Sequence, residues 1–166
     1  IVKLNFSVVS QSKQLFKAKG VILAGGNGER LRPLTDVLNK HFIPLYDKPL
    51  IYYSLSTLML AGLRDIYLIT RPEDKETYIK LLGDGSKWGM NITYIVQTKP
   101  RGVADALLLL DGYIKKENIV LILGDNFFYG KDFINQISKS KNVRGAKVFA
   151  YKVTNPSSYG IVQFDN

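Results

Sequence analysis

Short apolar segments alternate along this chain with longer segments that carry helix signals, and this alternation restricts the fold more than any other feature. The apolar segments predict strands over residues 20–25, 64–70, 90–97, 117–125 and 146–153, with 159–165 as a further candidate. The segments between them predict helices over 49–63, 72–85, 102–114 and 131–140. Strands separated by such helices form right-handed βαβ units. The chain is therefore predicted to be an α/β protein with three layers, α/β/α, and a mainly parallel sheet.

Composition narrows the class of protein further. The 166 residues with 46% hydrophobic content suit one globular domain, and no apolar run is long enough for a membrane helix. Cysteine is absent, which excludes a disulfide framework and a thiolate metal site and fits a cytoplasmic protein. The net charge of +9 comes from dispersed basic residues, and there is no basic run. Anionic small molecules are therefore expected partners, whereas nucleic acid and membrane are not.

Three of the predicted strands end in residues that suit a ligand site. Gly25 and Gly26 follow the first strand, Gln97 ends the third, and Asp125 follows the fourth. In parallel α/β sheets ligands bind at the carboxyl ends of the strands, so these residues are expected to meet in one crevice.

The glycine turn after the first strand, "GGNGER", is open to two interpretations on its own. Glycines at such a place let backbone N–H groups approach a phosphate closely. However, a Walker A loop needs Gly-Lys-Ser/Thr where Gly28, Glu29 and Arg30 stand, and the dinucleotide fingerprint needs glycine where Leu31 stands. The turn by itself is equally compatible with a tight strand-to-helix connection that binds nothing.

A longer pattern carries a resemblance to a known family. The segments "LAGGNGERLRPLT" and "NKHFIPLYDKPLIYYSLSTLMLAGLRDI" are followed by "GDGSKWGMNITYIVQTKPRGVADAL" and "LILGDNFFYGKDF". In this order they resemble the sugar-nucleotide pyrophosphorylases, and within them the glucose-1-phosphate thymidylyltransferases. The resemblance runs from Gly20 to the last residue. It implies a Rossmann-like nucleotidyltransferase domain over 20–166, of which this chain holds the N-terminal, nucleotide-binding part, and leaves 1–19 as an unassigned extension.

The resemblance also implies a reaction and a set of site residues. Glucose 1-phosphate attacks the α-phosphate of dTTP with Mg²⁺ as cofactor, pyrophosphate leaves, and the dTDP-glucose formed feeds deoxysugars such as rhamnose for polysaccharide synthesis. Arg30, Lys40 and Asp125 are implied as catalytic residues, and Asp125 also as the metal ligand. The implied nucleotide-binding residues are Leu23, Ala24, Gly25, Gly26, Asn27, Gly28, Glu29, Arg30, His41, Gln97, Pro100 and Gly102. The implied sugar-binding residues are Asn126, Tyr159 and Gly160. Full-length relatives are expected to be homo-oligomers.

Two residues depart from the family pattern. Glu29 stands where the family usually has threonine, and His41 stands where it usually has glutamine. A carboxylate beside a triphosphate is unfavourable unless it points outward or pairs with a cation. The sequence also stops at Asn166, just after the start of the sugar-contacting region, so a partial chain with reduced or no turnover is expected.

Other readings stay open at this point. The chain could be an inactive relative that keeps the nucleotide pocket, or a pyrophosphorylase that uses UTP or CTP, because thymine and uracil present the same edge to Gln97. Each site residue also has a plain structural interpretation: Arg30 and Lys40 as solvated cations, Asp125 as a turn cap, and Gln97 as an exposed strand end.

Overall fold

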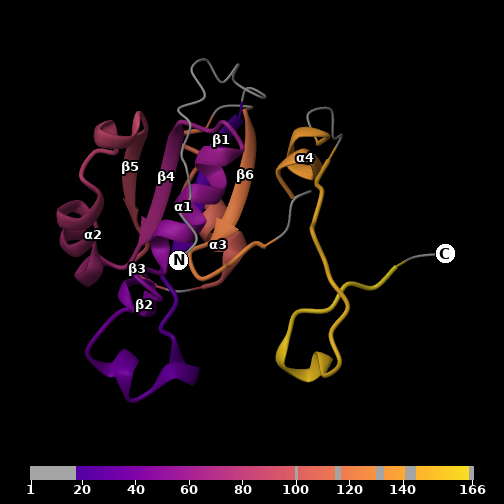
Figure 1. Ribbon diagram of the computed structural model, residues 1–166, viewed down its shortest axis with the longest axis horizontal. Coiled ribbons are helices and arrows are strands. Elements are labelled where there is room, and N and C mark those ends of the chain that lie inside the picture. The colour runs from indigo at the N-terminus through magenta and orange to yellow at the C-terminus, as the bar shows by residue number, and fades with distance from the viewer. Residues whose placement is uncertain (1–17, 100, 115–116, 130–132, 141–144, 165–166) are drawn as a thin grey trace.

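Four parallel strands form the centre of the structure (Figure 1). The computed structural model describes residues 18–99, 101–114, 117–129, 133–140 and 145–164. The strands of this sheet are β1 (Ala18–Ala24), β4 (Asp65–Thr70), β5 (Asn91–Val96) and β6 (Asn118–Leu123). Their order is β5-β4-β1-β6, and every neighbouring pair is parallel. The predicted parallel sheet is confirmed.

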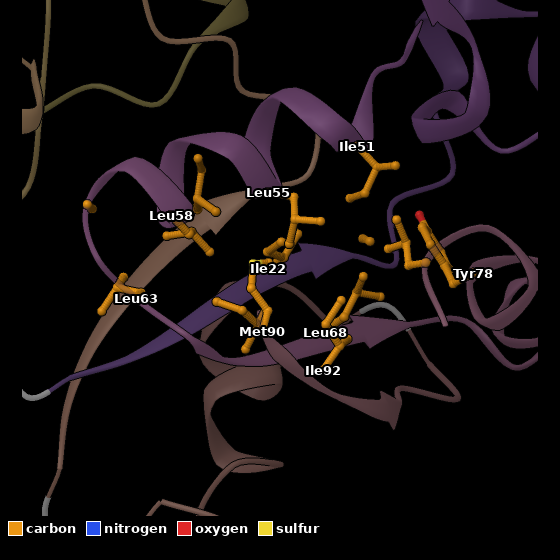
Figure 2. Packing of buried hydrophobic residues seen from close by; sticks show 14 of the residues in the cluster. Ile22, Ile51, Leu55, Leu58, Leu63, Leu68, Tyr78, Met90 and Ile92 are labelled. Atoms are coloured by element: carbon orange, nitrogen blue, oxygen red, sulfur yellow. The ribbon is translucent and has the colours of Figure 1, made fainter. Parts of the chain in front are cut away.

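Helices cover both faces of this sheet. The helices are α1 (Ile51–Leu60), α2 (Lys75–Leu82), α3 (Val103–Leu108) and α4 (Phe133–Ser138). Apolar side chains of α1 and α2 pack with Ile22 and Leu68 on one face, as Figure 2 shows for α1. Ala106 of α3 packs with Val21 and Ile69 on the other face. Successive strand residues thus enter opposite cores, which confirms the three-layer α/β/α arrangement.

The connection from β1 to α1 is irregular and contains most of the predicted motif. It holds three one-turn 3-10 helices, η1 (Glu29–Leu31), η2 (Leu34–Asp36) and η3 (Lys40–Phe42). They are followed by a hairpin of two short strands, β2 (Pro44–Leu45) and β3 (Lys48–Pro49). The connection from β1 to α1 projects beyond the carboxyl ends of the strands, below the sheet in Figure 1. Elsewhere in the chain, three further one-turn helices are η4 (Pro72–Asp74), η5 (Ser86–Trp88) and η6 (Pro156–Ser158).

The strand order creates one place where a ligand crevice is expected. The chain leaves β1 toward β4 on one side, and β6 pairs with β1 on the other. Where the connections of two neighbouring strands depart in opposite directions, a gap is left outside the carboxyl ends of those two strands. In this sheet the gap falls between the ends of β1 and β6, where Leu23 is paired with Leu123.

The prediction of strands over 146–153 and in the described part of 159–165 is wrong. Residues 145–164 form no strand, and in Figure 1 they run apart from the sheet. Val148 and Tyr151 are 74% and 77% exposed. Their side chains favour an extended backbone, but a strand also needs a neighbouring strand to pair with its N–H and C=O groups. No described strand pairs with this segment.

Two smaller differences concern element ends. Strand β1 begins at Ala18, before the predicted start, and α3 ends at Leu108, because the following residues form turns rather than helix. Residues 131–132 of the predicted last helix lie outside the described residues, and α4 occupies most of the remainder. Over the described ranges, no helix has the length and apolar character that crossing a membrane requires.

Candidate active site

A cavity of about 260 Å³ opens at the carboxyl end of the sheet, between the ends of β1 and β6. Its wall is formed by the glycine turn after β1, by η3, by the end of β5, by α3 and by the residues after β6. The lining residues are Leu23, Gly25, Gly26, Lys40, His41, Gln97, Gly102, Val103, Ala106, Leu123 and Asp125. The convergence of three strand ends predicted from the sequence is therefore present in the structure.

The glycine turn is held in shape by contacts that exclude larger side chains. Gly28 adopts φ 66°, a left-handed conformation that L-residues seldom take. A Cβ on Gly28 would lie 2.9 Å from Thr35 Cγ2, and the Thr35 hydroxyl donates to the Gly28 carbonyl at 2.8 Å. A Cβ on Gly26 would lie 3.5 Å from Lys40 Nζ. The turn backbone therefore reaches close to a lysine ammonium.

Lys40 and Asp125 form an ion pair across the cavity. The Lys40 ammonium donates to Asp125 Oδ2 at 2.6 Å, and this contact joins η3 to the end of β6. Burial alone would raise the pKa of Asp125, but the hydrogen bond and the charge of Lys40 outweigh it and hold that pKa below its usual value. The carboxylate is therefore ionised at neutral pH beside a cation, in a cavity that could admit an anionic ligand.

His41 is the buried neighbour of this ion pair. Its side chain is 1% exposed, and its Nδ1 lies 3.0 Å from the Tyr78 hydroxyl. A Cβ on Gly124 would lie 2.9 Å from His41 Nε2, so only glycine fits beside the ring. Burial, with the adjacent Lys40 charge, lowers the pKa of His41 to about 4. The imidazole is therefore neutral at physiological pH.

A buried hydrogen-bond network supports η3. Asn39 caps η3 by accepting from the His41 backbone N–H at 3.0 Å. The Asn39 amide donates to Asp74 Oδ2 at 2.6 Å, and Arg71 Nε donates to the same oxygen at 2.7 Å. Asn39 and Asp74 are both buried. This network links η4 to η3 and fixes the backbone that carries Lys40 into the cavity.

Gln97 closes the cavity on the side of β5. It is 8% exposed, and its backbone N–H donates to the Thr70 carbonyl at 2.8 Å. Its side-chain Nε2 donates to Asp105 Oδ2 at 2.8 Å. A Cβ on Gly25 would lie 3.3 Å from Gln97 Oε1, so the amide oxygen faces the glycine turn.

Eight of the sequence-predicted site residues line the cavity together. They are Leu23, Gly25, Gly26, Lys40, His41, Gln97, Gly102 and Asp125. Others lie nearby without lining it: Ala24, Asn27, Gly28, Glu29, Arg30 and Asn126. Glu29 and Arg30 are exposed on η1, so the Glu29 carboxylate does not project into the cavity. Tyr159 and Gly160 are exposed in the segment that runs apart from the sheet. Pro100 lies outside the described residues.

Sequence reasoning missed two groups of residues. Val103, Ala106 and Leu123 line the cavity but carry the apolar pattern of core positions, so no chemical signal marks them. Asn39 and Asp74 stand in irregular segments, and Asn39 just before a one-turn helix could have been recognised only as a cap. Contacts between residues this far apart in the sequence need the tertiary structure.

The described residues include no group of three or more His, Cys, Asp or Glu side chains that could hold a metal ion. Asp125 is the single carboxylate in the lining of the cavity. Mg²⁺ commonly takes one or two protein carboxylates, with substrate phosphates and water as the other ligands. The donor set therefore fits Mg²⁺ delivered together with phosphate oxygens.

Comparison with known proteins assigns the family. The Nucleotidyl transferase family profile matches residues 19–166. The chain is 50% identical over 148 residues to a glucose-1-phosphate thymidylyltransferase of Neisseria meningitidis and 49% identical over 147 residues to one of Mycolicibacterium smegmatis. Both alignments cover 89% of this chain and 51% of the relative. The chain therefore belongs to the nucleotidyl transferase family.

Solved structures agree with this assignment. A protein of Bacillus anthracis assigned as a glucose-1-phosphate thymidylyltransferase, crystallised with sucrose, aligns with a TM-score of 0.68 and 38% identity, over 75% of this chain and 51% of that one. The inositol-1-phosphate CTP transferase of T. maritima aligns with a TM-score of 0.59 and 26% identity, over 68% and 45%. The Rossmann-like α/β fold is thus confirmed, and the chain spans about half the length of the curated relatives it matches.

Proposed function

We propose that this chain carries the nucleotide-binding half of a glucose-1-phosphate thymidylyltransferase. In that reaction an oxygen of the glucose 1-phosphate phosphate group attacks the α-phosphorus of dTTP. The bond between the α-phosphorus and the bridging oxygen breaks, pyrophosphate leaves with that oxygen, and dTDP-glucose forms. The names and identities of the relatives support this reaction for the whole protein.

One observation carries the proposal: the Lys40–Asp125 ion pair lies beside the glycine turn at the carboxyl ends of β1 and β6. Nucleotidyl transfer needs positioning and neutralisation of charge more than covalent help from the protein. A glycine backbone, a lysine and a carboxylate in one cavity supply these functions. We assign the backbone N–H groups of Gly25–Glu29 to the triphosphate and Lys40 to the α-phosphate and the sugar phosphate.

The remaining roles follow from charge and hydrogen-bonding capacity. Arg30 would hold pyrophosphate oxygens as negative charge develops on the leaving group. Gln97 both donates and accepts, which suits the imide edge of thymine, and Gly102 would let the backbone meet the same base. We assign Asp125 to Mg²⁺, which when bound would neutralise charge on the phosphates. Asn126 is assigned to the sugar.

Little turnover is expected from this chain by itself. The other two residues assigned to the sugar, Tyr159 and Gly160, do not line the cavity and are exposed in the segment that runs apart from the sheet. A sugar phosphate would therefore meet an incomplete site, whereas four of the residues that we assign to the phosphates and Mg²⁺, namely Gly25, Gly26, Lys40 and Asp125, line one cavity. For the whole protein we propose residues 20–166 as the first part of the catalytic domain, a homo-oligomeric assembly, and the cytoplasm as the place where both substrates are available.

The test is the thermal unfolding of the full 166-residue chain with Mg²⁺ and each of dTTP, UTP, CTP, ATP and GTP. A ligand that binds only the folded state raises the melting temperature. A cooperative transition raised mainly by dTTP, with little pyrophosphate released on adding glucose 1-phosphate, is the expected result. A cooperative transition that no nucleotide raises would refute nucleotide binding by this chain.

The same experiment separates a second candidate. One structural neighbour is a CTP transferase, and thymine and uracil offer Gln97 the same edge. A pyrophosphorylase that uses UTP or CTP would give its largest shift with that nucleotide. An inactive relative would be indicated if Glu29→Thr with His41→Gln strongly raised activity.

A further inference from the structure

The Gln97 side chain separates two cavities, and its two amide atoms face different sides. The first cavity is the candidate active site, where Gly25 is also part of the wall. The second, also about 260 Å³, is lined by Gln97 and Asp105 together with Thr98, Lys99 and Arg101. Asp105 belongs to the second cavity only. The Gln97 amide nitrogen is thus hydrogen-bonded to Asp105 on the side of the second cavity, and the amide oxygen faces the glycine turn of the active site.

The identity of residue 105 determines this orientation. A carboxylate at neutral pH accepts hydrogen bonds and donates none, so Asp105 can pair only with the Gln97 amide nitrogen. Turning the amide by half a rotation would bring two oxygens 2.8 Å apart with no proton between them. The Nε2–Oδ2 contact therefore holds Oε1 toward the cavity. No described residue donates a hydrogen bond to Oε1, so an acceptor remains available to a ligand.

We propose that Asp105 is a positioning residue that sets nucleobase selectivity by fixing the orientation of the Gln97 amide. A fixed acceptor selects a base edge that carries an N–H donor. Thymine and uracil present N3–H at that edge, whereas cytosine presents N3 as an acceptor. Two opposed acceptors leave both groups without a partner, a mismatch that typically costs more than an order of magnitude in selectivity. The second Gln97 N–H stays available for a neighbouring carbonyl of the base.

This inference rests on the proposed function and adds a residue that does not touch the nucleotide. Asp105 also accounts for the choice between thymine and cytosine, which Gln97 alone leaves open. An unrestrained glutamine amide can turn either atom toward a base and accommodates thymine and cytosine alike. With Asp105 in place, the site discriminates by hydrogen-bond polarity, and it does not separate thymine from uracil.

The experiment measures dissociation constants for dTTP, UTP and CTP with Mg²⁺ by calorimetry, on the full chain and its variants. The wild type is expected to bind dTTP and UTP at least about tenfold more tightly than CTP. Asp105→Asn keeps the shape but can donate to Oε1, which releases the amide to turn. The ratio of CTP to dTTP dissociation constants should then fall severalfold, chiefly because CTP binds better.

Two further variants make the result decisive. Asp105→Glu retains an acceptor-only group and should keep most of the preference. Asp111→Asn removes the same charge from an exposed position just beyond α3, outside both cavities, and should leave the ratio unchanged. A purely structural role for Asp105 would weaken all three nucleotides equally.

The failures are distinguishable. An unchanged ratio in Asp105→Asn, or an equal loss for all three nucleotides, overturns the inference and leaves the proposed function standing. If the wild type binds none of the three nucleotides, the proposed function fails, and the inference fails with it.

Discussion

The two sides of the cavity are built in opposite ways. On the side of η3, polar groups are buried and paired: Asn39, His41 and Asp74 are each under 10% exposed, and each makes a hydrogen bond. On the side of the glycine turn, residues 26–27 and 29–30 are exposed and offer backbone groups and charged side chains. The buried side is held by its own hydrogen bonds, while the exposed side presents polar groups at the surface, where a ligand can reach them.

Because of this difference, substitutions that affect the stability of the fold can be separated from substitutions that affect ligand binding. A polar group that is buried cannot be removed without leaving its partner unsatisfied, so changes on the η3 side should act on folding first. A substitution on the exposed side should change the affinity for the ligand and leave the free energy of unfolding unchanged.

Removing Asp74 should have the largest effect. Asp74→Ala leaves the Asn39 amide and the Arg71 guanidinium without their shared acceptor, and we expect a loss of about 3 kcal/mol in the free energy of unfolding. Urea denaturation measures it. The matched control is Asp36→Ala, which breaks a surface pair with Arg32 and should cost less than about 0.5 kcal/mol. Equal effects of the two changes would contradict the comparison.

Acid should destabilise the buried side through His41. The folded-state pKa is about 4 and the ordinary value is 6.5, so between these values the unfolded chain binds more protons than the folded one. Stability is therefore fully present above pH 6.5 and falls as the pH is lowered toward 4, by about 3 kcal/mol over the window.

The measurement is the free energy of unfolding of wild type and His41→Gln across that window. The variant should lack this part of the acid loss. Burial is the main cause of the low pKa; the charges of Lys40 and Arg71 add to it, and those of Asp125 and Asp74 oppose it. Parallel pH profiles for the two proteins would show that the imidazole is solvated and that the buried side is not closed.

Arg30 tests the exposed side. Arg30→Gln should weaken the binding of dTTP with Mg²⁺ by about tenfold, because a charge-assisted contact to phosphate is lost. The free energy of unfolding should change by less than about 0.5 kcal/mol, as for other surface substitutions. Arg32→Gln in the same connection is the control and should leave binding unchanged. Loss of stability without loss of binding would reverse the assignment of the two sides.

Substitution of two buried threonines, Thr70 and Thr57, should give the smallest effects. Thr70 Oγ1, at the end of β4, is buried without a hydrogen-bond partner among the described residues, whereas Thr57 Oγ1 donates to the Tyr53 carbonyl at 2.9 Å. Thr70→Val should therefore stabilise the fold by up to about 1 kcal/mol, and Thr57→Val should destabilise it by a similar amount. Thermal unfolding of the two variants compares them, and a destabilised Thr70→Val would point to a water-bonded hydroxyl.

The sequence predicted best what depends on local pattern. The apolar runs predict the four sheet strands, and the rule that ligands bind at strand ends predicts the convergence of Gly25, Gln97 and Asp125 that the structure shows. The Gly28 position was also recognisable, because a glycine turn has a local steric cause. These features need only the residues themselves and the topology of a parallel sheet.

What the sequence could not predict depends on distant partners. Residues 146–153 have strand propensity, but pairing is decided by whether a neighbouring strand is present. Asp74 resembles an ordinary helix-start residue, and its contact with Asn39 spans 35 positions. Asp105 resembles a solvated residue of a helix first turn until its contact with Gln97 is seen. Such contacts are set by how the elements pack.

The function proposed for this chain requires that a nucleoside triphosphate binds in the cavity beside Lys40 and His41. The most direct test is an NMR titration of the imidazole resonances with dTTP and Mg²⁺, since His41 is the single histidine of the sequence and its signal needs no further assignment. Binding in this cavity should shift that signal saturably, at concentrations that also raise the melting temperature. A raised melting temperature with an unmoved His41 resonance would mean that the nucleotide binds outside this cavity.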